Sequence, residues 1–156
     1  MKVPTYLSII AIAFVSCIST AMAEEITEEQ VAAAQKTWGD GIVKIGKLKG
    51  DAEAAKKAAS EHLDTLYAYD LGKVLFKPTK AADDQFRETK GQALSYFVGG
   101  EVPEDKGFAL QPWTKVRFEN HGTVINGKTA TAMGNYFFTT TEGDEVKVEY
   151  SFCYIL

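Results

Sequence analysis

Apolar residues recur at three- and four-residue steps near the start of the chain, which is the spacing of an amphipathic helix. Thr27 and Gln30 are three residues apart, as in a helix-capping box. The pattern therefore predicts a helix over residues 26–48, with an apolar face formed by Val31, Ala34, Trp38, Ile42 and Ile45.

Glycines interrupt this helix at Gly39, Gly41 and Gly46. Each weakens a helix by up to about 1 kcal/mol relative to alanine, so we interpret them as sites of close packing against a neighbouring element. Gly50 and Asp51 form a stop followed by a new cap. A second helix is therefore predicted over residues 52–69.

The hydrophobic pattern changes after Gly72. A short buried strand at residues 74–76, ended by Pro78, is followed by a segment, residues 81–94, that fits either a third short helix or an irregular stretch. Asn126-Gly127 and Glu142-Gly143-Asp144 are strong hairpin signals between the later apolar runs. Those runs predict strands at residues 94–98, 113–119, 122–125, 129–140 and 146–155.

Helices followed by antiparallel strands predict an α+β domain, a cone-like curved sheet packed against the N-terminal helices. In the last run, apolar and aromatic residues from Val146 to Tyr154 alternate with Lys147, Glu149, Ser151 and Cys153, so the two sets face opposite ways. The printed sequence stops at Leu156, within this apolar strand. We therefore expect one domain over residues 24–156, truncated at its C-terminus.

The first 23 residues show the three parts of a secretory signal. Lys2 precedes a short apolar stretch, and Ala21-Met22-Ala23 supplies a small-x-small cleavage site. A membrane anchor is the alternative, but the apolar run is shorter than the roughly 20 residues that a spanning helix needs. A lipoprotein site at Cys17 fits less well because Phe14 stands where leucine is preferred. We expect cleavage after Ala23 and a periplasmic or secreted protein.

Charge and cysteine content exclude several classes of partner. The formal net charge is −4 at pH 7, without basic runs, so nucleic acid is a poor candidate partner. Removal of residues 1–23 leaves Cys153 as the single cysteine, so no internal disulfide is expected. Two histidines, His62 and His121, lack metal-ligand spacing, and we interpret them as surface or capping residues.

Hydroxyl and aromatic side chains are the more suggestive group. Thr79 follows Pro78 at the end of a predicted strand, and Tyr96 is on the strand predicted before Gly99-Gly100. A curved sheet closed by helices often encloses a pocket lined by such groups. Tyrosines are also ordinary core residues with a paired hydroxyl, and composition alone favours that interpretation. The candidates on the later strands are Tyr136, Tyr150, Ser151 and Tyr154.

Several long strings resemble the bacterial and algal iota-class carbonic anhydrases. They are Trp38-Gly-Asp-Gly-Ile-Val-Lys-Ile-Gly46, Val74-Leu-Phe-Lys-Pro-Thr79, Ala93-Leu-Ser-Tyr-Phe-Val-Gly-Gly100, Gly107-Phe-Ala-Leu-Gln-Pro-Trp113 and Met133-Gly-Asn-Tyr-Phe-Phe138. The resemblance covers essentially all of residues 24–156. It implies a nuclear-transport-factor-2-like cone, a homodimer and the reversible hydration of carbon dioxide to bicarbonate.

The resemblance also implies roles for particular residues. Thr79 and Tyr96 match the threonine and tyrosine that hydrogen-bond the substrate or the attacking water in the metal-free scheme. Some family members are described as depending on a divalent metal, but no metal ligand or cofactor is predicted in this chain. Family members continue into a strand with a His-His-Ser-Ser motif, and the printed sequence ends before it. A non-enzymatic ligand-binding or oligomerisation module of the same fold is the alternative function.

Overall fold

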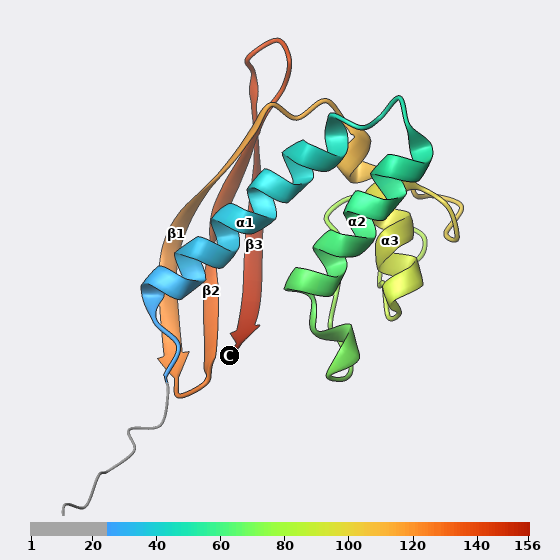
Figure 1. Cartoon of the computed structure of the whole chain (residues 1–156). Helices are drawn as coiled ribbons and strands as arrows, with labels where there is room; N and C mark the ends of the chain where they lie inside the picture. Colours follow the sequence, from blue (N-terminus) through green and yellow to red (C-terminus); the bar gives the residue numbers. More distant parts are fainter. Residues whose placement is uncertain (1–24) are drawn as a thin grey trace, which may run out of the picture.

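The computed structural model describes residues 25–156, so the predicted signal peptide lies outside the described residues. The described chain forms an α+β domain, as the sequence predicts, in which helices precede a three-stranded sheet (Figure 1). Its elements are α1 (Glu28–Gly46), α2 (Ala52–Leu66), the 3₁₀ turn η1 (Ala68–Asp70), α3 (Lys90–Val98), the 3₁₀ turn η2 (Phe108–Leu110), β1 (Lys115–Asn126), β2 (Thr129–Thr139) and β3 (Glu145–Ile155). None of the helices in this part of the chain is long and apolar enough to cross a membrane.

The predicted capping box of α1 is confirmed. The Thr27 hydroxyl accepts the backbone N–H of Gln30, and the Gln30 side chain accepts the backbone N–H of Thr27. The glycines of α1 do mark close approaches. A Cβ on Gly41 would lie 2.2 Å from Nδ1 of His62, and one on Gly46 would lie 2.9 Å from the Ala109 carbonyl oxygen. These contacts let α1 pack closely against α2 and η2.

The sheet is antiparallel in the order β1-β2-β3, and α1 lies across one of its faces (Figure 1). Both predicted hairpins are confirmed, one at Asn126-Gly127 and one between Thr139 and Glu145. The strands predicted at 113–119 and 122–125 form a single strand, β1. An irregularity between Asn120 and Gly122 shifts its register without ending it.

Two strand predictions are wrong. Residues 94–98 belong to helix α3, which begins at a second capping box between Thr89 and Gln92. Residues 74–76 form no strand, and Leu75 is 89% exposed. Each of the two interpretations of residues 81–94 is correct for part of the segment. The chain is irregular up to Thr89 and helical from Lys90.

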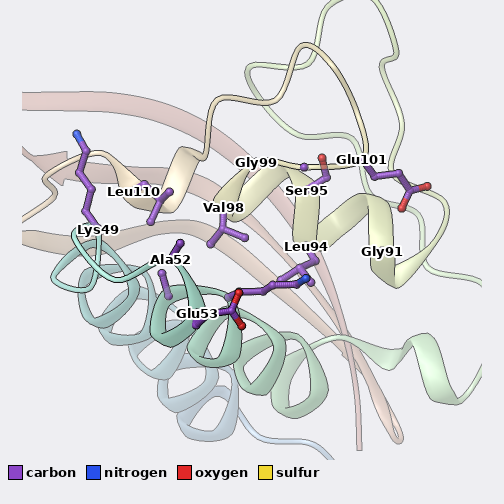
Figure 2. A pocket seen from close by; sticks show the side chains of 13 residues that line it. Lys49, Ala52, Glu53, Gly91, Leu94, Ser95, Val98, Gly99, Glu101 and Leu110 are labelled. Atoms are coloured by element: carbon purple, nitrogen blue, oxygen red, sulfur yellow. The ribbon is translucent and has the colours of Figure 1, made fainter.

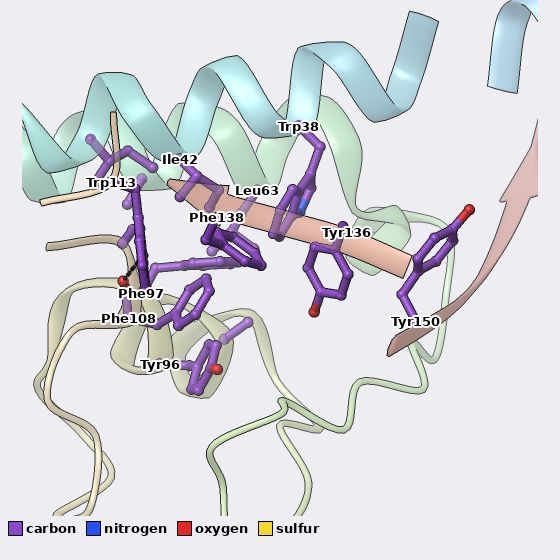
Figure 3. Close-up of a cluster of buried hydrophobic side chains, with 14 of the residues drawn as sticks. Trp38, Ile42, Leu63, Tyr96, Phe97, Phe108, Trp113, Tyr136, Phe138 and Tyr150 are labelled. Atoms are coloured by element: carbon purple, nitrogen blue, oxygen red, sulfur yellow. Dashed lines mark hydrogen bonds between the residues drawn. The ribbon is translucent and has the colours of Figure 1, made fainter. Parts of the chain in front are cut away.

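Aromatic rings fill the space between α1 and the sheet (Figure 3). Trp38 stands at the centre, with its ring centroid 5.8 Å from that of Tyr136 and 6.2 Å from that of Phe138. Its indole N–H donates to the Tyr67 hydroxyl at 2.9 Å, which satisfies the one polar atom of the ring. This aromatic core fixes β2 relative to α1, and β2 carries Tyr136.

Candidate functional site

Two of the predicted hydroxyl residues meet directly. Tyr136 is on β2, where strand alternation directs its buried side chain toward the helices. Thr79 is on the irregular segment between η1 and α3, next to the buried Pro78. The Thr79 and Tyr136 hydroxyl oxygens are 3.3 Å apart, and either can be the donor. Because Thr79 is exposed to solvent and Tyr136 is buried, the pair joins the surface to the core.

Tyr96 reaches the same segment from the other side. It projects from α3 rather than from a strand, and its ring stacks on Phe108 at 5.3 Å and meets Phe76 edge-on at 5.7 Å. Burial raises the pKa of its hydroxyl, and a hydrogen bond from the Lys80 backbone opposes that rise. Since Lys80 follows Thr79, Tyr96 lies beside the segment that carries Thr79.

A second hydroxyl pair lies farther along the sheet. Nε2 of Gln35, a buried residue of α1, donates to the Tyr150 hydroxyl at 3.0 Å and to the Tyr154 hydroxyl at 3.1 Å. The Tyr150 hydroxyl in turn donates to the Asn120 side chain. The Tyr150 ring lies edge-on to Tyr136 with their centroids 5.6 Å apart, so this pair continues the first cluster (Figure 3).

Ser151 does not join either cluster. It is exposed and points to the opposite face of the sheet from Tyr150, because neighbouring strand residues alternate. The alternation along the sequence already predicts that Ser151 faces away from Tyr150. Ser151 therefore does not belong with the predicted pocket residues.

The tyrosines of this region are protonated at neutral pH. Burial raises the pKa of Tyr136 and Tyr150, and raises that of Tyr154 to about 12. A neutral hydroxyl donates one hydrogen bond and accepts others. The cluster can therefore hold a small oxygen-rich anion and stabilise charge that develops on its oxygens, but none of these groups is a base at neutral pH.

His62 corrects the interpretation of both histidines as surface or capping residues. His121 is exposed, but His62 is only 7% exposed and packs against Trp38, Tyr67 and Phe97. Burial lowers its pKa to about 4, so it is neutral at pH 7. Among the described residues, no group of three or more His, Cys, Asp or Glu side chains could hold a metal ion.

Two hollows in the described structure lie away from these hydroxyls. A groove of about 390 Å³ lies between α2, α3 and the segment that follows α3, with Lys49, Glu53 and Glu101 among its lining residues (Figure 2). Another, of about 330 Å³, lies beside His62 between α1 and α2. Neither is lined by Thr79, Tyr96 or Tyr136.

Sequence reasoning missed several residues that support the cluster. Gln35 is a single polar residue on the apolar face of α1, and the sequence pattern gives no information about which side chains it contacts. Arg87, whose side chain is fully buried, was also missed, because arginine is almost never fully buried unless paired. The capping-box spacing of Thr89 and Gln92 was the available signal that Tyr96 is on a helix.

The fold described above recurs in one class of carbonic anhydrase. The chain belongs to the metal-independent carbonic anhydrase family, whose model matches residues 29–156. The iota-class resemblance is thereby confirmed.

Two relatives place the chain within this family. A metal-independent carbonic anhydrase of Nostoc sp. (strain PCC 7120 / SAG 25.82 / UTEX 2576) is 47% identical over 130 residues, which cover 80% of this chain and 63% of that protein. The chain thus spans less than two thirds of the curated relative's length. The crystal structure of an iota-carbonic anhydrase from a cyanobacterium, complexed with bicarbonate, matches with a TM-score of 0.82 and 40% identity, over 88% of each chain.

Proposed function

We propose that this protein catalyses the reversible hydration of carbon dioxide to bicarbonate without a metal ion. The observation that carries the proposal is the meeting of the Thr79 and Tyr136 hydroxyls, 3.3 Å apart, beside the segment that hydrogen-bonds Tyr96. Membership of the metal-independent family and the bicarbonate bound in the related structure support the same chemistry.

The hydroxyls act by positioning and by stabilising charge. A water oxygen attacks the carbon of carbon dioxide, one C=O π bond opens, and negative charge develops on the oxygen of that bond. Tyr96 and Tyr136, both protonated, donate hydrogen bonds to that oxygen, while exposed Thr79 orients the attacking water. The water loses one proton to bulk solvent, which leaves bicarbonate. No tyrosine serves as the base, because the raised pKa values keep all of them protonated.

The test is carbon dioxide hydration by purified protein, measured by stopped flow with and without a chelator. We expect equal rates in both conditions, and a loss of about 10- to 100-fold in kcat/KM for Thr79→Ala and for Tyr96→Phe. Thr131→Ala is the matched control, because Thr131 is an exposed hydroxyl on the opposite face of β2. Wild-type rates no higher than those of buffer would refute the proposal, and chelator-sensitive rates would refute its metal-free form.

Two further parts of the proposal concern where the enzyme is located and how it assembles. The signal pattern in residues 1–23 supports export to the periplasm or beyond, and mass spectrometry of the mature protein from the producing cells should find it beginning at Glu24.

The family resemblance supports a homodimer. Light scattering on an eluting column peak should give twice the chain mass, and a monomer at micromolar concentration would contradict this.

A further inference from the structure

The segment that carries Thr79 has no regular secondary structure of its own. Between η1, which ends at Asp70, and α3, which begins at Lys90, the chain contains turns and bends only. No ladder of backbone hydrogen bonds therefore fixes the position of Thr79. Its placement beside Tyr136 must come from contacts with other parts of the molecule.

Glu104 supplies three contacts of this kind. One of its carboxylate oxygens, Oε2, accepts the backbone N–H groups of Ala82 at 2.9 Å and Asp83 at 3.1 Å. The other, Oε1, accepts the N–H of Asp84 at 3.0 Å. Three consecutive amides thus converge on one carboxylate, just beyond Thr79 in the chain. These hydrogen bonds hold the pKa of Glu104 at about 2, so the carboxylate stays charged across the working pH range.

Arg87 ties the same segment to the core. Its guanidinium is fully buried and pairs with Asp105, with Nη2 2.6 Å from Oδ1 and Nε 3.2 Å from Oδ2. Nη2 also lies 3.4 Å from Oε1 of Glu104, and Nη1 donates to the carbonyl of Asp84 at 2.5 Å. The guanidinium carbon is 6.0 Å from the centre of the Tyr96 ring. Arg87 therefore links the segment after Thr79 to Asp105, and its guanidinium lies near the Tyr96 ring.

The segment that carries Glu104 is itself fixed to the helix of Tyr96. Ser95, buried on α3, accepts the backbone N–H of Val102 at 2.8 Å. Val102 in turn accepts the N–H of Asp105 at 3.0 Å. Two hydrogen bonds thus link Ser95, the neighbour of Tyr96, to Asp105. The residue before Asp105 in the chain is Glu104, which binds the amides beyond Thr79.

We propose that Glu104 is a positioning residue for the reaction: it holds Thr79 at the correct distance from Tyr96 and Tyr136 without touching the substrate. The proposal rests on the proposed function. A misplacement of about 1 Å in a group that orients a reactant can lower a rate about 100-fold. Loss of three charge-assisted hydrogen bonds to a segment without regular secondary structure permits a displacement of that size.

The test is a double-mutant cycle in carbon dioxide hydration with Thr79→Ala, Glu104→Ala and the double variant. Glu104→Ala should lower kcat/KM about 10- to 100-fold, and the double variant should be no slower than Thr79→Ala alone, because Glu104 acts through Thr79. Glu101→Ala is the matched control: Glu101 is an exposed carboxylate of the same segment and should leave the rate unchanged. Glu104→Gln keeps one acceptor oxygen and should recover part of the loss.

Each result decides the proposal. Wild-type kinetics in Glu104→Ala overturns it, and so do losses from Thr79→Ala and Glu104→Ala that multiply, since Glu104 would then act elsewhere. If Glu104→Ala does not fold, Glu104→Gln takes its place in the cycle; the retained Asp105 pair keeps Arg87 satisfied in both variants. Faster hydrogen exchange at the amides of Ala82, Asp83 and Asp84 in a folded variant is a second expected result. An inactive wild type would refute the proposed function itself, whereas an active wild type with an unchanged Glu104→Ala refutes only the positioning role.

Discussion

The Tyr136 hydroxyl lies 3.3 Å from that of Thr79, although 57 positions separate them in the chain. One residue belongs to the central strand of the sheet and the other to a segment without regular structure. The contact therefore depends on two independent supports: the aromatic core behind β2, and the Glu104 and Arg87 contacts that hold the irregular segment. Its disruption should affect activity before it affects the fold.

Tyr136→Phe removes the hydroxyl and keeps the ring. We expect kcat/KM for carbon dioxide hydration to fall about 10- to 100-fold, because one donor to the developing negative charge is lost. The ring contacts with Trp38 and Phe138 remain, so the thermal midpoint should change little. Thr79→Ser is the complementary variant: it retains the hydroxyl and should keep most of the activity. Full activity in Tyr136→Phe would remove this residue from the site.

Acid should destabilise the protein through His62. Burial lowers its pKa from 6.5 to about 4, so the folded state keeps it neutral while the unfolded state takes up a proton below pH 6.5. The stability from this residue is full above pH 6.5 and is lost as the pH falls toward 4, by an amount on the order of 3 kcal/mol. Urea unfolding between pH 7 and 4 measures it.

The control for this pH dependence is the other histidine. His62→Leu should flatten the stability curve between pH 6.5 and 4, whereas His121→Gln, at an exposed site, should leave its shape unchanged. Identical slopes in the wild type and His62→Leu would show that other groups cause the acid sensitivity.

High pH should lower the free energy of unfolding through the buried tyrosines, whose pKa values burial raises. Burial raises the pKa of Tyr69 and of Tyr154 from 10 to about 12, so the folded state holds these protons where the unfolded state releases them. Stability should therefore be constant up to about pH 10 and should fall between pH 10 and 12. Absorbance of tyrosinate should rise later in the folded protein than in urea, and coincident titrations would contradict the burial of these hydroxyls.

Gly41→Ala should destabilise the fold by about 2 kcal/mol or more. The new Cβ would lie 2.2 Å from Nδ1 of His62, so the imidazole would have to shift out of its contacts with Trp38, Tyr67 and Phe97. Gly50→Ala is the matched control, since a Cβ added there would meet no atom within 4 Å. Chemical denaturation of both variants should show a large loss for the first and little change for the second; equal stabilities would show that α1 and α2 can separate at low cost.

Where local chemistry decided the structure, the sequence alone was sufficient. The Thr27 capping box, the periodic face of α1, the Asn126-Gly127 hairpin and the alternation along β3 all depend on neighbours in the chain, and all are confirmed. The strings around Thr79 and Tyr96 identified the family for the same reason, since they are contiguous.

Only the tertiary structure decided the rest. The apolar run at residues 94–98 fits either period, and the capping-box spacing of Thr89 and Gln92 is the one local signal for a helix; packing against η2 and α2 adds the rest. Burial of Arg87 depends on two carboxylates that lie 17 and 18 positions away, and burial of His62 depends on the rings of Trp38 on α1 and Phe97 on α3. Ser151 and Tyr150 are neighbours in the chain, yet the sheet separates them to opposite faces while it brings Tyr136 to Thr79. These relationships depend on packing between residues that are far apart in the chain. A local sequence pattern contains no information about the energy of such contacts.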